Sequence, residues 1–500
     1  MKKNLLIAIL LFTFAASRAQ TIESKVKEFD AYAEKSRNLY QVPGLALTVV
    51  KDGKVIFKKG YGVQQLGTTN AVDTQTLFAC ASTTKAMTAT CMAILVDEGK
   101  VKWDDPVINY LPDFQLYDVQ VTRELKIRDL FTHNSGVGNA DFLWSIMNIP
   151  SDEVLSKMKM VKPSYSLRSG FIYQNIFYLY AGKVIEKVSG QPWEEFIQKR
   201  IFQPLGMTRT YPMLKMVNDA NQSQPHYMIE NKITVIKRTN ADAIGPAGSV
   251  WSCIDDMSKW ALCMLDSSKY GEGRLVKPST WKEMFKPQVI VSANEFYPTA
   301  QLTKPNWMTY GLGWFQQDYM GKKVNYHTGS LAGETAIHGQ LPDSKLAIYV
   351  FGNYDHAEVR HALMFKAFDL FGTGGTRDWS SEFHTLYKNI QAGADKSEKA
   401  SEAARVANTK PSLSLDEYAG TYTDPLFGEV IITRENEDLI IVSNQFLKAR
   451  VSHWHYDTFR GWHDKRWYGK INVTFNLGAN GKISTVNFDG LELKRTSSKP

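Results

Sequence analysis

The 500-residue sequence predicts an α+β domain with an inserted helical part, followed by a small all-β domain. Three observations indicate this arrangement. Apolar β-rich runs lie near the start, within 45–61, and again within 323–351, so strands from both ends of the first domain can share one sheet. Helical patterns and loops fill most of 104–265 between them. After Pro411 the chain divides into short alternating segments separated by turn residues, which is typical of a half-barrel or a lipocalin-like sheet.

The first 19 residues have the form of a secretory signal. Lys2 and Lys3 precede an apolar run from Leu5 to Ala16, and Ser17-Arg18-Ala19 is a small-x-small cleavage site. The run is too short for a stable anchor, and no later segment is long and apolar enough to span a bilayer. We therefore expect a periplasmic or secreted protein that is cut after Ala19 and has no stable membrane anchor.

The first domain is expected over 20–375, a helical or partly flexible connector over 376–410, and the all-β domain over 411–500. Asp52-Gly53 predicts a tight hairpin between the first two strands. The expected helices of the first domain cover 21–38, 82–99, 176–190 and 357–370, and its expected strands cover 45–50, 54–61, 323–327, 334–341 and 345–351. The expected strands of the all-β domain cover 418–422, 429–433, 439–443, 449–452, 470–477 and 483–488.

Composition excludes some classes of partner. The formal net charge is +8, three of these positive charges leave with the signal, and no basic run suggests nucleic acid. Cys80 and Cys91 lie too far apart around one helix to bridge, and Cys253 and Cys263 face much the same objection if 255–265 is helical. A bridge between the two pairs stays open, but buried free thiols are the favoured interpretation. The oligomeric state is not predicted.

Residues 78–96 contain the first candidate chemical group. Apolar residues there recur at the spacing of a helix that buries one face, with Ser82 as the expected N-terminal cap. Lys85 is three residues further on, so its amine rises over the same face as the serine hydroxyl. An amine whose pKa is lowered by burial can take the proton of a serine nucleophile. Backbone N–H groups at the helix start can bind an oxyanion.

Ser-x-x-Lys alone does not choose its serine, since it begins at Ser24, Ser82, Ser156 and Ser279. Two further motifs single out Ser82. Tyr173-Gln174-Asn175 directly precedes a helix, and His327-Thr328-Gly329-Ser330 ends an expected strand and enters a glycine-containing loop. Ser-x-x-Lys, Tyr-x-Asn and His-Thr-Gly, in this order and spacing, resemble the serine β-lactamase and penicillin-binding-protein superfamily. Because the second motif has a tyrosine, the chain resembles in particular the branch that contains the class C β-lactamases, the family VIII esterases and the D-aminopeptidases.

The resemblance covers about residues 30–371 and implies a role for each motif residue. Ser82 would be the nucleophile, Lys85 its base and Tyr173 a proton carrier, while Asn175 would bind Lys85 and the substrate's acyl side chain. Backbone N–H groups of Ser82 and Ser330 would form the oxyanion hole.

His327, Thr328 and Gly329 would line the substrate site. One position departs from the pattern, because β-lactamases carry lysine where this chain has His327. A histidine with an ordinary pKa of about 6.5 is mostly neutral at pH 7, which puts recognition of a substrate carboxylate in doubt. His133, by contrast, resembles a structural loop residue of the family.

The sequence thus predicts an exported serine hydrolase that cleaves ester or amide bonds of small or peptide-like substrates without a cofactor or metal. The alternatives are an acyltransferase with an alcohol acceptor, a β-lactamase or DD-carboxypeptidase, and a non-catalytic binder of peptidoglycan fragments. His453, His455 and His463 suggest a metal site in the all-β domain, but no carboxylate or cysteine pattern accompanies them, which favours an aromatic-lined surface.

Overall fold

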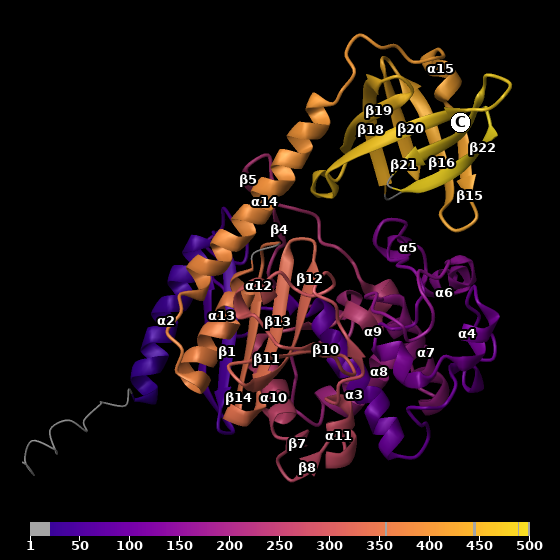
Figure 1. Ribbon diagram of the computed structural model, residues 1–500. Helices are drawn as coiled ribbons and strands as arrows, with labels where there is room; N and C mark the ends of the chain where they lie inside the picture. The colour runs from indigo at the N-terminus through magenta and orange to yellow at the C-terminus, as the bar shows by residue number, and fades with distance from the viewer. Residues whose placement is uncertain (1–20, 356–357, 444–446, 489, 499–500) are drawn as a thin grey trace, which may run out of the picture.

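The computed structural model describes residues 21–355, 358–443, 447–488 and 490–498. They form an α+β domain, a long helix and a closed barrel, in that order (Figure 1). The predicted α+β fold and the all-β second domain are confirmed, and the second domain is a closed barrel rather than a half-barrel. The predicted signal segment lies outside the described residues.

An eight-stranded antiparallel sheet forms the centre of the first domain. In sheet order its strands are β2 (Lys54–Gly62), β1 (Gly44–Lys51), β14 (Leu346–Gly352), β13 (Glu334–Leu341), β12 (Lys322–Leu331), β11 (Phe315–Tyr319), β10 (Met308–Tyr310) and β9 (Val289–Ile290). Strands from both ends of the domain therefore pair within one sheet, where β1 lies beside β14. The predicted hairpin is confirmed: Asp52 and Gly53 have φ angles of 49° and 73°, which suit a two-residue turn.

Helices cover both faces of this sheet. On one face α13 (Val359–Phe368) packs on β13 and β14, and α2 (Ile22–Leu39) packs against α13. On the other face α10 (Ile254–Leu265) packs on β1 and β14. The helical insertion extends beyond this second face (Figure 1). Its remaining helices are α3 (Thr84–Asp97), α4 (Val119–Glu124), α5 (Phe142–Ser145), α6 (Ser151–Lys157), α7 (Ile176–Ser189), α8 (Trp193–Ile197), α9 (Gly245–Gly248), α11 (Pro278–Met284) and α12 (Ala300–Thr303).

Short strand pairs join this insertion to the sheet. β3 (Phe78–Ala79) pairs with β6 (Trp251–Ser252), so the segment before Ser82 is fixed against a distant part of the chain. β4 (His226–Ile229) and β5 (Lys232–Val235) form a hairpin. A smaller hairpin joins β7 (Lys269–Tyr270) to β8 (Gly273–Arg274).

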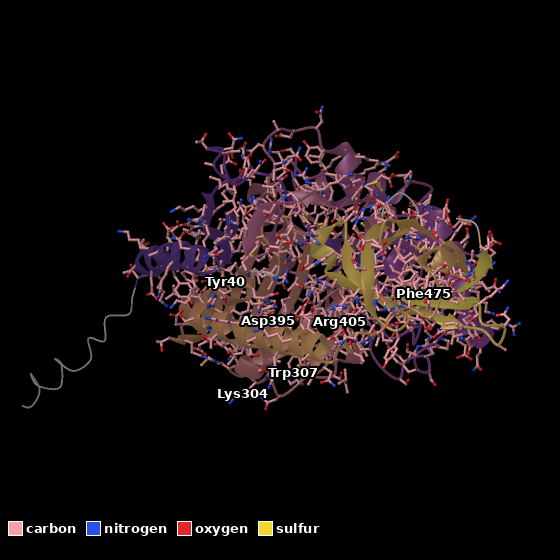
Figure 2. The ribbon with its side chains drawn as sticks, turned by 90° about the horizontal axis from the view of Figure 1, so that it is seen from above. Tyr40, Lys304, Trp307, Asp395, Arg405 and Phe475 are labelled. Carbon is pink, nitrogen blue, oxygen red and sulfur yellow. The ribbon has the colours of Figure 1, made fainter. Side chains whose placement is uncertain are left out.

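A 25-residue helix, α14 (Trp379–Ala403), links the two domains. Its first turns belong to the core of the first domain, because Trp379 and Phe383 are fully buried against Phe365. α14 runs up to the barrel, which overlies the helical insertion when viewed from above (Figures 1 and 2). After α15 (Leu415–Tyr418), the barrel strands follow in chain order: β15 (Gly420–Asp424), β16 (Gly428–Glu435), β17 (Asp438–Ser443), β18 (Leu447–His455), β19 (Thr458–His463), β20 (Lys470–Leu477), β21 (Ile483–Phe488) and β22 (Leu491–Ser497).

Two further expectations concern membranes and thiols. Within the described ranges, no helix has both the length and the apolar character needed to cross a bilayer. Cys80, Cys91, Cys253 and Cys263 are buried and free, as the favoured interpretation predicts.

Candidate active site

Ser82 lies in a short 3-10 turn, Ala81–Thr83, that leads directly into α3. The prediction that Ser82 caps the helix is wrong, because α3 begins at Thr84 and Ser82 is inside the preceding turn. Ala81 has a φ of 47°, so the backbone bends sharply before the serine. The prediction of a single buried face is also wrong: every residue of α3 from Thr84 to Leu95 is buried, because α7, α9 and α11 surround the helix.

Lys85 occupies the first turn of α3 and is fully buried beneath Ser82. Its Nζ lies 3.0 Å from Ser82 Oγ, 2.6 Å from Asn175 Oδ1 and 3.0 Å from the carbonyl oxygen of Ala247. Two of these three neighbours are oxygens that can only accept hydrogen bonds. A neutral amine has two N–H groups and one lone pair, so these two acceptors leave the lone pair for the Ser82 hydroxyl.

Burial lowers the pKa of Lys85 to about 7, and the Asp141 carboxylate offsets part of this effect. Lysine ordinarily titrates near 10.4, so this amine loses its proton in the physiological range. The geometry and the pKa agree: near neutral pH Lys85 can accept the proton of Ser82.

Tyr173 and Asn175 lie just before α7, and both contact Lys85. The Lys85 Nζ lies 4.8 Å from the centre of the Tyr173 ring. Burial raises the pKa of Tyr173 well above its usual value, and a hydrogen bond with Ser82 opposes the rise. Asn175 accepts from Lys85 through Oδ1 and donates through Nδ2 to Asp141 Oδ2, 2.7 Å away. Asp141 thereby fixes which end of the Asn175 amide faces the lysine.

The third motif lies on β12, and the structure changes how it is placed. The sequence predicts that the strand ends at His327, but β12 continues through Ser330 to Leu331. Gly329 packs directly against the turn that carries Ser82: a β-carbon at Gly329 would lie 2.2 Å from the Cys80 carbonyl oxygen and 3.1 Å from Ser82 N. Glycine is therefore required there. Because it has no side chain, the backbones of Ser82 and Ser330 can lie close together.

His327 does not face the solvent. The side chain is 1% exposed, with Nδ1 2.6 Å from the carbonyl oxygen of Thr328 and Nε2 2.9 Å from Tyr310 Oη. Since a carbonyl only accepts, Nδ1 carries the proton and Nε2 accepts from Tyr310. Burial, followed by the nearby Lys85 charge, lowers the pKa of His327 to about 3. The lowered pKa agrees with the expectation that His327 is mostly neutral at pH 7. Its ring packs among the aromatic rings of Tyr173, Tyr310 and Phe315, and its role in substrate binding stays a prediction.

Thr328 and Ser330 have partners that the motif does not indicate. Thr328 Oγ1 lies 2.5 Å from Tyr297 Oη. The guanidinium of Arg360 donates to the Gly329 carbonyl oxygen and to Ser330 Oγ, the latter 2.9 Å away. Arg360 is 4% exposed and forms an ion pair with buried Glu358 at 3.2 Å. A fixed positive charge therefore lies behind the peptide that joins Gly329 to Ser330.

His133 has a structural place near Tyr173, as the resemblance implies. It adopts a φ of 60°, its Nδ1 accepts from the backbone N–H of Gln174 at 3.0 Å, and its ring lies 4.3 Å from that of Tyr173. Burial lowers the pKa of His133 well below its usual value. A neutral His133 thus supports the loop that presents Tyr173.

Sequence reasoning missed Asp141, Arg360 and Glu358. Asp141 follows a loop with no periodic pattern, and only its short distance from Asn175 in the fold reveals it. Arg360 and Glu358 read as polar positions at the start of an amphipathic helix. A buried pair of opposite charges so close in sequence gives no signal that distinguishes it from a solvated helix end.

Comparison with known proteins agrees with this geometry. The family model described as Beta-lactamase matches residues 23–369, and a domain of unknown function, DUF3471, matches residues 404–499. The chain is 24% identical to an unguisins hydrolase of Aspergillus campestris over 84% of this chain and 80% of that protein. It is 25% identical to penicillin-binding protein 4 of Amycolatopsis lactamdurans over 65% of this chain and 84% of that protein.

Solved structures share the fold. An octameric penicillin-binding protein homologue from Pyrococcus abyssi superposes with a TM-score of 0.62 at 20% identity, over 94% of this chain and 99% of that one. A D-stereospecific amidohydrolase from Streptomyces gives 0.54 at 22% identity, over 69% and 99%. The chain belongs to the β-lactamase family of serine hydrolases, with an all-β barrel as a second domain.

Proposed function

We propose that this protein is an exported hydrolase that forms an acyl-enzyme on Ser82 and cleaves ester or amide bonds of small or peptide-like substrates. The observation that carries the proposal is the position of Lys85, whose Nζ lies 3.0 Å from Ser82 Oγ with a pKa of about 7. A serine with only a structural role would not need a buried amine held against its hydroxyl.

In the proposed first step, Ser82 Oγ attacks the substrate carbonyl carbon while Lys85 Nζ takes the hydroxyl proton. The negative charge that develops on the carbonyl oxygen is bound by the backbone N–H groups of Ser82 and Ser330. The carbon–leaving-group bond then breaks, and the leaving atom receives a proton through Tyr173. The high pKa of Tyr173 keeps its phenol protonated at neutral pH, as a proton donor requires.

In the second step, water attacks the ester formed on Ser82 and the acid is released. Lys85 or Tyr173 accepts the water proton as the ester carbonyl becomes tetrahedral, and the same oxyanion donors act again. Ser82 regains a proton when its bond to the acyl carbon breaks. Asn175, held by Asp141, can donate from Nδ2 to Asp141 while Oδ1 fixes Lys85, so the base keeps its position through both steps.

The substrate class rests on the first domain and its relatives. Neutral His327 gives no positive charge where β-lactamases carry lysine, so uncharged esters and amides suit the site better than penicillins. The relatives named above include an unguisins hydrolase and a D-stereospecific amidohydrolase. The second name favours amide hydrolysis.

Covalent labelling with a fluorophosphonate tests the proposal. Wild type should be labelled, whereas Ser82→Ala should be neither labelled nor active towards p-nitrophenyl acetate, with an unchanged circular dichroism spectrum. Ser156→Ala is the matched control, because Ser156 begins another Ser-x-x-Lys but lies exposed on α6. Labelling that persists in Ser82→Ala would refute the assignment.

A further inference from the structure

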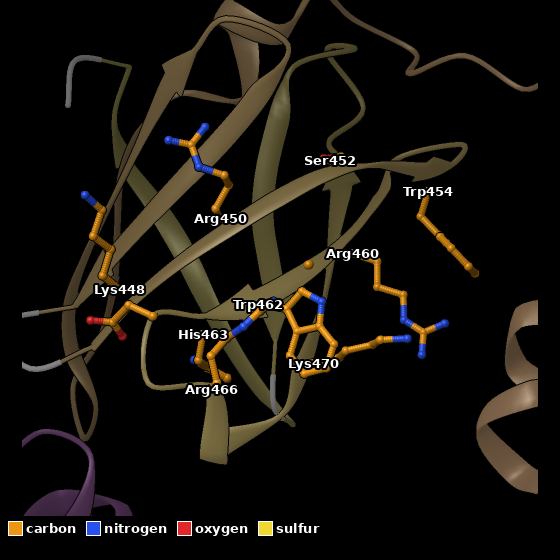
Figure 3. Close-up of a pocket in the computed structure, with 11 residues that line it drawn as sticks. Lys448, Arg450, Ser452, Trp454, Arg460, Trp462, His463, Arg466 and Lys470 are labelled. Atoms are coloured by element: carbon orange, nitrogen blue, oxygen red, sulfur yellow. The ribbon is translucent and has the colours of Figure 1, made fainter. Parts of the chain in front are cut away.

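A groove of about 630 Å³ lies on the outer wall of the barrel, between β18, β19 and the start of β20 (Figure 3). Outward-facing side chains of paired strands meet there, since Arg450 lies opposite Trp462 and Ser452 opposite Arg460. The groove has one carboxylate, Asp464, and a larger number of cationic side chains. The cationic residues are Lys448, Arg450, Arg460, Arg466 and Lys470. The groove therefore has the lining expected of a site for an anionic ligand.

Arg460 is the buried centre of this groove. It is only 8% exposed, its guanidinium lies 4.7 Å from the Trp454 ring centre, and its Nη2 donates to Glu398 at 2.5 and 2.6 Å. The Nε and Nη1 groups are buried and have no hydrogen-bond acceptor among the described residues. Buried donors are rarely left unpaired, so Arg460 offers two hydrogen bonds to an incoming oxygen-rich group.

The aromatic side of the groove is Trp462, which is 37% exposed. Arg466 lies 4.3 Å from its ring centre and Lys470 Nζ lies 5.5 Å from it. The acids that pair with Lys470 are themselves exposed by 41% for Glu398 and 48% for Glu402. Ion pairs between exposed groups are weak, so a ligand carboxylate can displace them.

One end of the groove, at Arg466, lies against the first domain. Arg466, in the connection from β19 to β20, pairs with Glu230 at the tip of the β4–β5 hairpin, 2.8 Å away. Two residues further on, the Tyr468 hydroxyl donates to the carbonyl oxygen of Ser145 in α5, 3.2 Å away. One short barrel segment thus contacts two separate parts of the first domain.

Each of these two parts adjoins residues next to the candidate active site. α5 directly follows Asp141, which holds the amide of Asn175. The β4–β5 hairpin begins at His226, whose N–H donates to the Gly333 carbonyl in the turn that follows β12. The segment Asp464–Gly469 therefore spans from the Asn175 side of the cleft to the Ser330 side. A substrate that extends out of the cleft meets the lower end of the basic groove.

We propose that this groove binds a carboxylate of the substrate, on the part that lies beyond the bond cleaved at Ser82. The inference rests on the proposed function for the identity of the ligand, but it places recognition of the charge on the barrel rather than at His327. Arg460 and Lys470, which share Glu398, would bind the carboxylate, and Trp462 would pack against the adjoining chain.

Isothermal titration of full-length Ser82→Ala tests binding without turnover. The probes are N-acetylated hexaglycine with a free C-terminal carboxylate and the same peptide as its C-terminal amide. The acid should bind about tenfold more tightly than the amide, because a charge-assisted hydrogen bond is lost in the amide. Addition of Arg460→Gln, or separately of Lys470→Gln, should bring the affinity for the acid close to that for the amide.

Arg434→Gln is the matched control, since Arg434 is a barrel arginine that pairs with Asp416 outside the groove. It should leave the preference for the acid unchanged. Lys470 is exposed, so Lys470→Gln keeps the test valid if Arg460→Gln fails to fold. Equal binding of acid and amide, or a preference that survives both groove variants, would overturn the proposal. Fluorophosphonate labelling of wild type reports separately on Ser82, so failure of the groove and failure of the acyl-enzyme assignment are distinguishable.

Discussion

Gly329 lies in van der Waals contact with the backbone of Ser82, close enough that an added β-carbon would be 3.1 Å from Ser82 N and 2.2 Å from the Cys80 carbonyl oxygen. This contact sets the distance between the two backbone N–H groups proposed as the oxyanion hole. It is made by a strand from the end of the domain against a turn from its beginning, so the oxyanion hole depends on the whole sheet rather than on a local motif.

Gly329→Ala should therefore lower kcat for p-nitrophenyl acetate by about 100-fold or more, because loss of one oxyanion donor costs about 100- to 1000-fold. The alanine methyl group would meet backbone atoms, which cannot move aside as a side chain can. Gly393→Ala is the control: this glycine lies in α14 with open space around it, and the change should keep activity and add up to about 1 kcal/mol of stability. Wild-type kcat in a folded Gly329→Ala protein would contradict the oxyanion assignment.

The pH dependence of kcat/KM for the same neutral ester should report on Lys85. Below about pH 7 the amine is protonated and cannot accept the Ser82 proton, so the rate should rise about tenfold per pH unit and level off above pH 7. The sign follows from burial, which lowers the pKa of this lysine from its ordinary value. A limb near pH 10 in the pH–rate profile would show that Lys85 titrates as an exposed lysine and is not the base.

Asp141→Asn should move that limb to lower pH. The Asp141 carboxylate raises the pKa of Lys85, so removing its charge makes the amine easier to deprotonate. An asparagine at this position still offers an oxygen to Asn175 Nδ2, which keeps the amide oriented. Asp152→Asn, at an exposed carboxylate that pairs with Lys183, should leave the profile unchanged. A shift to higher pH in Asp141→Asn, or an equal shift in both variants, would disprove the electrostatic coupling.

The sequence predicts the parts of the site whose residues are close in the chain or follow a strong period. Lys85 is three residues after Ser82, so their contact follows from helix geometry. The central strands β12, β13 and β14 follow from their apolar runs. The period misleads where burial is complete, as in α3, because a helix covered on all sides has no polar face.

Other features depend on contacts between distant segments. Strands β9 and β10, at one end of the sheet, are too short to give an alternating signal. The buried Gln316 and Gln317 make β11 look like a polar loop. The neutral state of His327 depends on Tyr310 and on burial by the surrounding aromatic rings, so a motif comparison cannot reveal it.

The paired charges behind the oxyanion strand should contribute to kcat. Arg360 donates to the carbonyl oxygen of the peptide whose N–H belongs to Ser330, and such a bond polarises the N–H as a donor. Arg360→Gln combined with Glu358→Gln removes both charges together and avoids an unpaired buried ion. We expect kcat to fall about tenfold, which corresponds to about 1.4 kcal/mol, with little change in KM.

The double substitution Arg434→Gln with Asp416→Asn is the control for this prediction, because it removes an ion pair of the barrel far along the chain from the site. It should leave kcat unchanged. A fall in thermal stability without a fall in kcat in the Arg360 and Glu358 variant would assign the pair a purely structural role.

The last prediction concerns the choice between neutral esters and carboxylate-bearing lactams. An ordinary histidine gains positive charge below about pH 6.5, so a substrate-facing His327 would bind a β-lactam carboxylate better as the pH falls. In this fold the pKa of His327 is lowered to about 3, its Nδ1 proton is held by Thr328 and its Nε2 accepts from Tyr310. The imidazole thus stays neutral throughout the range in which the enzyme can be assayed. We expect slow turnover of nitrocefin relative to p-nitrophenyl acetate, with a ratio of the two kcat/KM values that does not change between about pH 5 and 8. Because Lys85 acts on both substrates, its own titration cancels in this ratio. A ratio that moves towards nitrocefin in acid, with a midpoint near pH 6.5, would mean that His327 takes up a proton and faces the substrate.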